Sequence, residues 1–249
     1  MITSLQNEKV KHWVSLKDKK YRDLANEYLI EGEHLVQEAY KNGYLKAILY
    51  VESLEDNYIN VEKIEVSENV MKKISTTQTP QKIAGIARFF DDVDIDYNQR
   101  MIALDDVQDP GNAGTIVRNS LAFGYNLVFF STNSVDIYNS KFIRATQGYF
   151  YSLKIVRGEI ISFVNKLKQN NYEIISTYLD NESLDINKFT PKEKHCLVFG
   201  NEGNGVSKEI IDLSDIKLII KMNDKVDSLN VSVASGIVMF DFNNKLLKI

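Results

Sequence analysis

The stretch Leu197-Val-Phe-Gly-Asn-Glu-Gly-Asn-Gly205 joins an apolar run to a polar, glycine-rich turn. The apolar run begins at His195 and has the length and side chains of a buried strand. Glycines in the turn allow a ligand to approach the backbone closely, because they carry no Cβ atom. This stretch therefore predicts a strand whose carboxyl end opens onto a ligand site.

Two further polar stretches stand beside apolar, strand-like runs in the same part of the chain. They are Asn112-Ala-Gly-Thr-Ile-Val-Arg118 and Ser228-Leu-Asn-Val-Ser232. Ligands of α/β sheets bind at the carboxyl ends of the strands. The three polar stretches together are therefore the candidate functional residues of the chain.

Strand-like and helix-like segments alternate from Arg100 to the end of the sequence. Near-continuous apolar strands between helices are typical of a parallel sheet that is covered on both faces, so the predicted fold class is α/β. The predicted strands are 100–107, 126–131, 152–156, 172–179, 196–200 and 217–222. One helix is predicted to begin at about 113, and the others are predicted at 139–147, 160–169 and 231–247.

The first part of the chain has a different pattern. Helical spacing extends over 7–24 and 32–42, strands are predicted at 45–51, 63–66 and 83–90, and Ser67 is a good N-cap for a helix at 68–74. The acidic run Asp91-Asp-Val-Asp-Ile-Asp96 interrupts both periodicities, so the domain boundary is placed there. The predicted domains are residues 1–94 and 95–249.

The net charge of the protein is −4, so its overall charge does not indicate that it binds polyanions. One N-terminal cluster of basic residues is either a phosphate-contacting patch or a solvated helix face. Its members are Lys9, Lys11, Lys17, Lys19, Lys20 and Arg22.

Cysteine and histidine usage argues against redox and metal chemistry. Cys196 is the single cysteine and lies inside an apolar run, so we expect a buried core thiol and not a nucleophile. The histidines at 12, 34 and 195 lack the spacing of metal ligands, so no metal is expected. No apolar signal core or membrane-length apolar stretch occurs, and the expected location is cytoplasmic.

Each polar stretch also has a structural interpretation. Asn112 is a candidate helix N-cap, and one of Ser228 and Asn230 can cap the last helix. Arg118 is either a surface side chain or a ligand for phosphate near a helix start. Glu202 is either a hydrogen-bond partner of a ligand or a charge at a helix N-terminus.

Gly200 and Gly205 have the separation found in a phosphate-binding P-loop. However, Val206 and Ser207 occupy the positions where that motif requires lysine and then serine or threonine. A nucleoside-triphosphate site is therefore excluded.

Together, the three stretches closely resemble the three motifs of the SpoU-type RNA 2′-O-ribose methyltransferases, members of the SPOUT superfamily. The similarity spans roughly 100–247 and reads Asn112-x-Gly114-x-x-x-Arg118, then Leu197 through Ser207, then Ile220-Lys-Met222 through Ser228-Leu-Asn-Val-Ser-Val-Ala234. The N-terminal part resembles the family's ribosomal-protein-like substrate-binding domain, notably at Leu29-Ile-Glu-Gly-Glu-His34 and Thr79-Pro-Gln81.

The resemblance implies a C-terminal trefoil-knotted parallel-sheet domain and a smaller N-terminal α+β RNA-binding domain. It implies a homodimer through the knotted domain, with an active site that includes residues of both subunits. Lys221 stands where many relatives have proline, and Asp224 stands where glycine is common. The implied S-adenosylmethionine site lies within the knot and is lined by Phe199, Gly200, Ile220, Met222 and Leu229.

The resemblance also assigns catalysis to Asn112, Arg118, Glu202, Ser228 and Asn230. Methyl transfer from a sulfonium to a ribose hydroxyl is an in-line displacement in which a weakly acidic proton must be removed. The family makes Arg118 the candidate base, but an arginine pKa above about 12 makes it a poor one. We therefore prefer a role in which Arg118 binds the target phosphate and stabilises the developing alkoxide.

The other three polar side chains, Asn112, Ser228 and Asn230, are then expected to orient the ribose and Arg118. Glu202 is expected to support the cofactor loop or the partner subunit's site. The predicted function is S-adenosylmethionine-dependent methylation of a ribose 2′-hydroxyl in structured RNA, with ribosomal RNA favoured over transfer RNA because of the N-terminal domain. The alternatives are a tRNA 2′-O-methyltransferase, a non-catalytic RNA-binding knotted dimer and an enzyme that methylates a base nitrogen.

Overall fold

The computed structural model describes residues 1–54, 57–91, 94–180 and 183–247. The chain forms two compact units: unit 1 is Met1–Asp91 with Asp136–Tyr151, and unit 2 is Asp92–Val135 with Ser152–Ile249. The predicted boundary falls in an acidic run that includes residues 92–93, which lie outside the described residues. The boundary at 94 stays a prediction, and nothing in the sequence pattern indicates that 136–151 packs with the first part.

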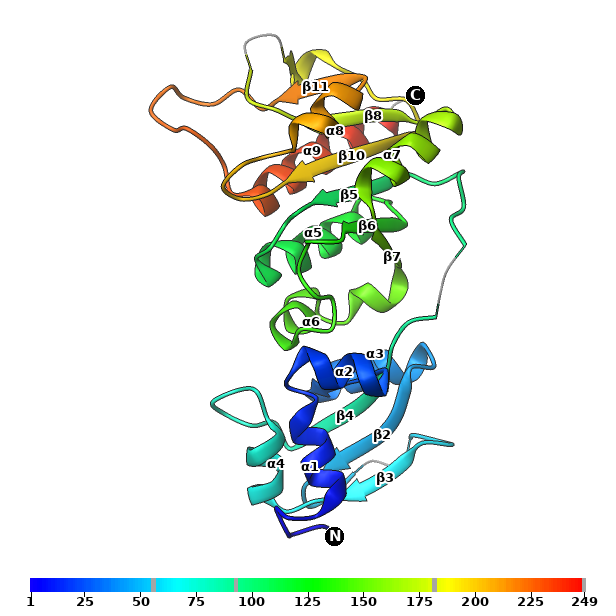
Figure 1. Ribbon diagram of the computed structural model, residues 1–249, viewed down its shortest axis with the longest axis vertical. Coiled ribbons are helices and arrows are strands. Elements are labelled where there is room, and N and C mark those ends of the chain that lie inside the picture. Colours follow the sequence, from blue (N-terminus) through cyan, green and yellow to red (C-terminus); the bar gives the residue numbers. More distant parts are fainter. Residues whose placement is uncertain (55–56, 92–93, 181–182, 248–249) are drawn as a thin grey trace. The chain divides into compact units, whose positions relative to one another are not determined.

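Unit 1 is built on a four-stranded sheet in the order β1-β4-β2-β3 (Figure 1). β4 pairs antiparallel with β1 and β2, whereas β2 and β3 are parallel. The strands are β1 (Glu27–Glu31), β2 (Leu45–Tyr50), β3 (Glu62–Glu65) and β4 (Ile83–Arg88).

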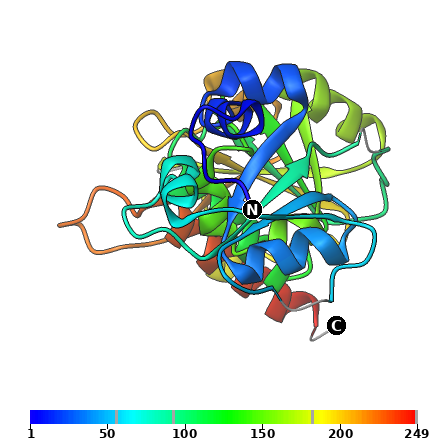
Figure 2. The same cartoon turned by 90° about the horizontal axis from the view of Figure 1, so that it is seen from below.

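Helices cover both faces of this sheet, which confirms the α+β class of the N-terminal part. α1 (Glu8–Ser15) and α4 (Glu68–Ile74) bury Trp13 and Met71 against one face. α3 (Glu33–Lys41) contacts β1, β2 and β4, and Figure 2 shows it on the opposite side from α1. α6 (Ser140–Thr146) and the 3-10 helix η1 (Tyr149–Ser152) come from the later part of the chain.

One prediction for unit 1 was wrong, and one strand was missed. The helix predicted over 7–24 is divided into α1 and α2 (Lys19–Ala25), because the Asp18 carboxylate accepts a hydrogen bond from the Lys20 N–H and begins a new helix. β1 was not predicted, although its burial pattern is that of an interior strand. The predicted cap at Ser67 is confirmed, because its side chain accepts from the Val70 N–H.

Unit 2 contains a seven-stranded sheet in the order β7-β6-β5-β10-β8-β11-β9. Every neighbouring pair is parallel, which confirms the predicted α/β class. The strands are β5 (Met101–Asp105), β6 (Leu127–Ser131), β7 (Lys154–Gly158), β8 (Glu173–Thr177), β9 (Leu184–Asp185), β10 (His195–Gly200) and β11 (Ile216–Ile219). How the chain is threaded does not follow from strand order, so the knot stays a prediction.

Two helices cover each face of this sheet (Figure 1). α7 (Ile160–Gln169) and α8 (Lys208–Leu213) pack against the face that carries Cys196 and Val198. α5 (Pro110–Ala122) packs against α9 (Val231–Leu246) on the other face, and the 3-10 helix η2 (Ile186–Lys188) follows β9. The sheet is therefore covered on both sides, and its strand ends are left for function.

Cys196 is fully buried, and burial raises the pKa of its thiol, which confirms the predicted core role. Within the described ranges, no group of three or more His, Cys, Asp or Glu side chains is arranged to hold a metal ion. In the same part of the chain, no helix combines the length and the apolarity needed to span a membrane.

His195 is a neutral polar group inside the sheet. Its Nδ1 lies 2.6 Å from the Lys192 carbonyl oxygen, which can only accept, so Nδ1 carries the proton. Nε2 then accepts from the Tyr125 hydroxyl at 2.8 Å. Burial lowers the pKa of His195 to about 4, because the charged imidazolium loses its hydration.

We predict that protonation of unfolded His195 destabilises the fold in acid. The unfolded side chain has an ordinary pKa near 6.5, so the free energy of unfolding decreases as the pH falls from 6.5 towards 4, by about 3 kcal/mol. Urea unfolding at pH 7, 6, 5 and 4 measures this decrease. His195→Asn keeps a donor and an acceptor but does not titrate, so its stability should depend less on pH; an unchanged slope would contradict the assignment.

Candidate functional site

The candidate site lies at the carboxyl ends of β5 and β10, which are neighbours in the sheet. From β5 the chain runs outward through β6 and β7, whereas β8, β11 and β9 lie beyond β10. Strand order therefore changes direction between β5 and β10, which is where open parallel sheets bind ligands. The three polar stretches follow β5, β10 and β11, as the sequence predicts.

The turn after β10 is closed by its own backbone. Asn201 and Gly205 exchange two hydrogen bonds of 2.9 Å, and Gly205 has a φ of +70°. A Cβ atom on Gly200 would lie 2.0 Å from the carbonyl carbon of Gly205, so no larger residue fits at that position. The spacing of these glycines thus reflects a closed turn and not a triphosphate-binding loop.

Asn201 fastens this turn to the end of β5. Its Oδ1 accepts from the N–H groups of Gly203 and Asn204 at 2.9 and 3.2 Å, and its Nδ2 donates to the Asp106 carbonyl at 2.9 Å. Asp106 has a φ of +57°, which residues other than glycine rarely adopt. Its carboxylate accepts from Ser131 Oγ at 2.6 Å, which holds this backbone bend in place.

Glu202, in the middle of the turn, faces the segment that leads into α5. Its carboxylate accepts from the N–H groups of Gln108 and Asp109 at 3.3 and 3.1 Å and from Asn112 Nδ2 at 3.0 Å. Partial burial alone would raise the pKa of Glu202, but these hydrogen bonds outweigh it and lower the pKa below its ordinary value. The site therefore contains an ionised carboxylate near neutral pH.

Asn112 connects Glu202 to the start of α9. The carboxylate has no proton to donate, so Asn112 presents its NH₂ group to Glu202 and its oxygen to Asn230. Asn230 Nδ2 donates to that oxygen at 2.9 Å, while Asn230 Oδ1 accepts from the Ser232 N–H at 2.9 Å. The side chains Glu202, Asn112 and Asn230, which we call the amide chain, join all three polar stretches.

The structure corrects the cap interpretation of Asn112. Asp109 is the N-cap of α5 and accepts from the Asn112 N–H at 2.9 Å, and Pro110 occupies the first helical position. Asn230 is the N-cap of α9, so Ser228 is not. The side-chain amide of Asn112 is consequently not used for capping and faces the site.

Arg118 is an exposed residue of α5. In residues 1–54, 57–91, 94–180 and 183–247 it has no hydrogen-bond or ion-pair partner. The adjacent Asn119 donates to the Ser232 carbonyl at 3.2 Å and to Ser235 Oγ at 3.3 Å, which fixes α5 against α9. Arg118 therefore extends from a rigid helix with its guanidinium N–H groups available to an anion.

A cavity of about 470 Å³ lies beside the amide chain. This volume is in the range of small-molecule sites. Of the predicted catalytic residues, Glu202, Ser228 and Asn230 line it, Asn112 contacts two of those three, and Arg118 lies outside it. All five predicted cofactor-binding residues line the cavity: Phe199, Gly200, Ile220, Met222 and Leu229.

One wall of the cavity was not predicted as part of the site. It is lined by Thr177, the last residue of β8, and by Tyr178 and Leu179, which follow; β8 is the neighbour of β10. The sequence shows them only as the end of an apolar run. These residues could have been identified from their position at the end of a strand next to β10. That identification requires the order of the strands in the sheet, which the sequence alone does not give.

Lys221, at the first departure from the family pattern, has an ion-pair partner in the structure. Its Nζ lies 3.5 Å from Asp185 Oδ2, at the end of β9. The second departure, Asp224, lies in the exposed loop between β11 and α9, which projects in Figure 1. Neither residue is among those that line the cavity.

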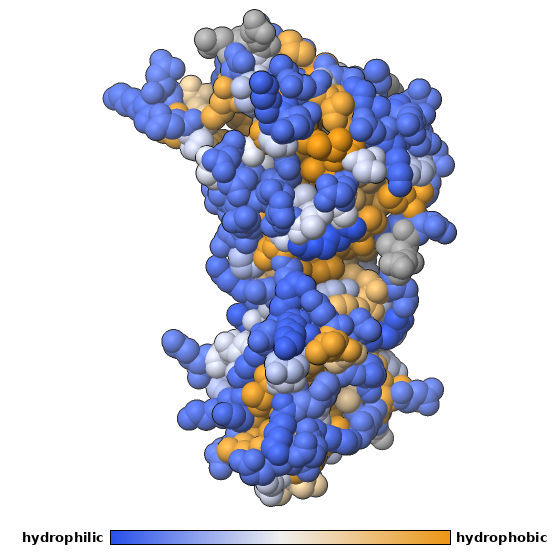
Figure 3. Space-filling view, in the orientation of Figure 1, coloured by the Kyte–Doolittle hydropathy of each residue, from blue (hydrophilic) through white to orange (hydrophobic). Residues whose placement is uncertain are grey.

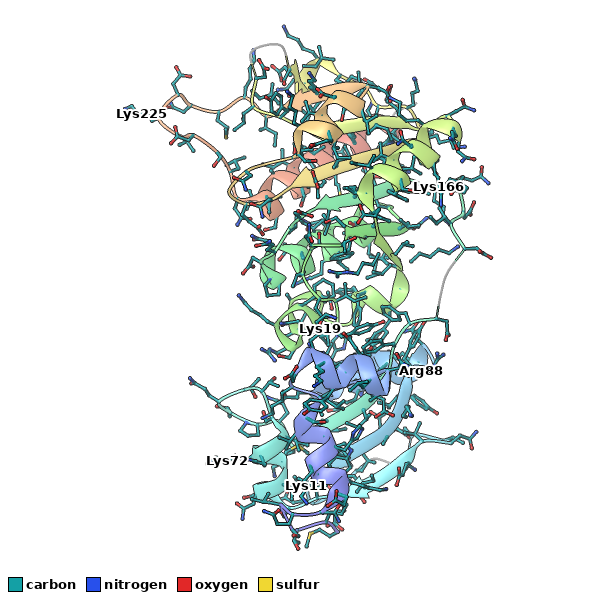
Figure 4. The ribbon with its side chains drawn as sticks, in the orientation of Figure 1. Lys11, Lys19, Lys72, Arg88, Lys166 and Lys225 are labelled. Atoms are coloured by element: carbon teal, nitrogen blue, oxygen red, sulfur yellow. The ribbon has the colours of Figure 1, made fainter. Side chains whose placement is uncertain are left out.

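The predicted basic patch is only partly available to a ligand. Lys9, Lys11 and Lys19 form ion pairs with Glu62, Glu8 and Asp23, respectively. Figure 4 labels Lys11 on α1 and Lys19 on α2. Lys20 lies 5.8 Å from the centre of the Tyr21 ring.

Arg22 is a correction to this patch, because its side chain is only 7% exposed. Its guanidinium donates to the Leu16 and Lys17 carbonyls and forms a 2.6 Å ion pair with Asp136. Arg22 therefore stabilises unit 1 and does not face solvent.

Two family models match this chain. The SpoU rRNA methylase family matches residues 99–240, and the MRM3-like substrate-binding domain matches residues 7–85. The first match covers the amide chain, the cavity and Arg118. The second covers most of unit 1 but not its 136–151 segment.

Two relatives named as 23S rRNA 2′-O-methyltransferases match over nearly the whole chain. A 23S rRNA (guanosine(2553)-2′-O)-methyltransferase, RlmP of Bacillus subtilis, is 33% identical over 96% of this chain and 97% of its own. A 23S rRNA (uridine(2479)-2′-O)-methyltransferase of Streptomyces viridochromogenes is 24% identical over 96% of this chain and 90% of its own.

A crystal structure of an AdoMet-bound rRNA methyltransferase from Sinorhizobium meliloti superposes with a TM-score of 0.88. It is 27% identical and covers 98% of this chain and 97% of its own. The fold, the motif residues and these matches agree, and the chain belongs to the SpoU family of RNA methyltransferases.

Proposed function

We propose that this protein methylates a ribose 2′-hydroxyl of ribosomal RNA with S-adenosylmethionine as the methyl donor. The observation that carries the proposal is the amide chain Glu202–Asn112–Asn230, which joins the three motif segments at the rim of a cofactor-sized cavity. The relatives that match over nearly the whole chain include two 23S rRNA 2′-O-methyltransferases. A cytoplasmic location, where a bacterial ribosome is found, is part of the same proposal.

The cavity residues fit S-adenosylmethionine. Leu229 and Met222 offer apolar contacts for the adenosine, Phe199 is fully buried beneath the cavity wall, and the closed turn at Gly200 brings main chain to that wall without intervening side chains. When bound, the cofactor supplies an electrophilic methyl group on a sulfonium. The protein's own contribution is to bind, align and exclude water.

Arg118 is assigned to the RNA side of the reaction. Its free guanidinium can bind a phosphate oxygen bidentately, and the same charge stabilises the alkoxide that forms as the 2′-hydroxyl loses its proton. Asn112 and Asn230 are assigned to orienting the ribose, and Ser228 lines the cavity beside Asn230. The expected contact of these side chains with Arg118 does not occur in the structure, in which Arg118 has no hydrogen-bond partner among the described residues. Glu202, which is ionised, fixes the orientation of the Asn112 amide and supports the cofactor turn.

The face of α9 that points away from the sheet supports a homodimer through unit 2. Val233, Ile237 and Phe240 follow one another at steps of four and three residues and are 51%, 39% and 56% exposed. Phe123 extends this apolar stripe, with its ring centre 5.9 Å from that of Phe240. Such a stripe on a helix is typical of a protein–protein contact, and we assign it to a second copy of the chain.

The exposed members of the predicted basic patch, Lys9, Lys11, Lys17, Lys19 and Lys20, are proposed as contacts to RNA phosphates. Arg22 is left out because it is buried. The lysine ammonium groups of unit 1 then contact a structured RNA, while unit 2 carries the reacting groups.

The function is tested by incubating the purified protein with labelled S-adenosylmethionine and, separately, 23S rRNA and tRNA. Methylation of the 2′-hydroxyl blocks alkaline cleavage of the adjacent phosphodiester, so we expect labelled alkali-resistant dinucleotides from the rRNA. Label in tRNA alone would show that the substrate is tRNA and not rRNA. Label in alkali-sensitive nucleotides would indicate methylation of a base. No label in either RNA would overturn the proposal.

In the same assay, Arg118→Ala should reduce kcat by about 100-fold or more, because the developing charge loses its counter-charge. Cofactor affinity, measured by calorimetry, and the sedimentation coefficient of the dimer should remain as in the wild type. Arg118→Lys keeps the charge without the bidentate geometry and should retain more activity than the alanine variant. Full activity of Arg118→Ala would remove this assignment.

A second prediction concerns the closed turn. Gly200→Ala places a Cβ atom 2.0 Å from backbone, so the turn must open, and we expect S-adenosylmethionine affinity to fall by about ten-fold or more. Gly203→Ala is the matched control in the same turn, because its Cβ would lie 3.5 Å from Asn201 Oδ1, an ordinary contact. Calorimetric titration and thermal unfolding of both variants measure the difference. Equal affinities in the two variants would contradict the role of the closed turn.

A further inference from the structure

The loop between α4 and β4 of unit 1 is ordered by one half-buried carboxylate. Glu31, the last residue of β1, accepts hydrogen bonds from the Thr76 N–H at 2.8 Å and from the hydroxyls of Thr76 and Ser75 at 2.5 Å each. Thr77 Oγ1 donates in turn to the Thr79 carbonyl at 2.9 Å. A loop without helix or strand is thereby held in one conformation, and it projects as a hydrophilic protrusion in Figures 1 and 3.

Arg144 of α6 is fixed against the same loop. Its Nη1 donates to Thr76 Oγ1 at 2.8 Å, and the Thr76 hydroxyl donates its own hydrogen bond to Glu31. Arg144 forms no ion pair with any carboxylate in the described residues. A guanidinium has five N–H donors, so most of those of Arg144 remain for another acceptor.

Contacts within unit 1 hold the segment that carries Arg144 in place. Asp136 forms an ion pair with the buried Arg22, and the hydroxyls of Tyr151 and Tyr28 lie 2.8 Å apart. These contacts fall at the two ends of the 136–151 segment. Arg144 is therefore presented by a rigid support, which lowers the entropy that it would lose on binding.

A second group of cations lies on the α4 side of the loop. Lys17 Nζ donates to the carbonyls of Lys73 and Ser75 at 2.9 and 2.7 Å. Lys72 and Lys73 are exposed and have no ion-pair partner in the described part of the chain, and Figure 4 shows Lys72 on the side of α4 that faces away from α1. Partial burial lowers the pKa of Lys17, Glu31 partly restores it, and the charge of Lys73 lowers it again.

We propose that the sugar-phosphate backbone of the RNA substrate binds to unit 1 mainly on this surface, formed by Lys17, Lys72, Lys73, the 75–82 loop and Arg144. The cations neutralise phosphates, and the threonine and glutamine side chains of the loop suit phosphate and 2′-hydroxyl oxygens. The patch predicted from the sequence is a weaker candidate, because Lys9, Lys11 and Lys19 already pair with carboxylates.

The proposal rests on the proposed RNA-methylating function and assigns part of the RNA surface to a helix, α6, that lies within the span of the methyltransferase family model. Two sequence segments separated by more than fifty residues thus form one surface. Binding that depends on phosphate contacts weakens with salt, and each cation removed lowers the dependence of log Kd on log salt by about one.

The test compares charge reversals in the full-length protein, with deproteinised 23S rRNA as the probe and filter binding over a range of salt. Lys73→Glu and Arg144→Glu should each weaken binding by about ten-fold and reduce the salt dependence by at least about one. Lys166→Glu is the control, because Lys166 is an exposed lysine on α7 of unit 2 (Figure 4). It should leave the affinity nearly unchanged.

The Lys73 side chain makes no hydrogen bond or ion pair in the described residues, so Lys73→Glu should leave the fold intact. This variant therefore tests the proposal even if Arg144→Glu disturbs the loop. Thermal unfolding identifies any such disturbance. Unchanged RNA affinity in Lys73→Glu and Arg144→Glu would overturn the proposal, as would a larger loss in a Lys9→Glu/Lys11→Glu variant. A wild-type protein that binds rRNA through this surface but transfers no methyl group would instead overturn the proposed function and leave the surface assignment intact.

Discussion

The structure of the site depends on one ionised carboxylate at the centre of a hydrogen-bonded chain. Glu202 receives two backbone N–H groups from the segment before α5 and the amide of Asn112, which in turn receives the amide of Asn230. Hydrogen bonds to a charged group stabilise by about 1.5–3 kcal/mol each, more than neutral ones. Because Asn230 also begins α9, one carboxylate sets the relative positions of β10, α5 and α9.

A second constraint is the contact between backbone and backbone at Gly200. The turn folds back so closely that only glycine fits, and Asn201 ties it to the strained residue Asp106 at the end of β5. Non-glycine residues with positive φ persist where the surroundings fix them, often at functional sites. The wall of the cavity beside Gly200 is consequently formed by main chain, and side-chain substitutions elsewhere change this wall little.

Much of this site could be predicted from the sequence, because each polar stretch directly follows an apolar strand. Parallel strands place those ends on one edge of the sheet, so the proximity of Asn112, Glu202 and Asn230 follows from the strand pattern. The exact partners do not. Asp109 and Asn112 are both acceptable N-caps, and only the backbone path shows that Asp109 caps α5 and leaves Asn112 for the site.

Charge was the property for which the sequence was least informative. Six basic residues near the N-terminus suggest a phosphate patch, but ion pairs with residues as distant as Glu62, and the burial of Arg22 against Asp136, are products of the fold. The interaction of Arg144 with Thr76 likewise crosses a long separation in sequence. Strand β1 and the division of the first helix at Asp18 were also not apparent, since short elements give weak periodicity.

The central claim is that the amide chain acts as one unit in methyl transfer to a ribose hydroxyl. A double-mutant cycle with Asn112→Ala and Asn230→Ala, measured as kcat/KM for 23S rRNA, tests it most directly. We predict that either substitution breaks the chain, so the double variant loses little more than each single variant and the coupling energy exceeds about 1 kcal/mol. Losses that add independently would contradict the account.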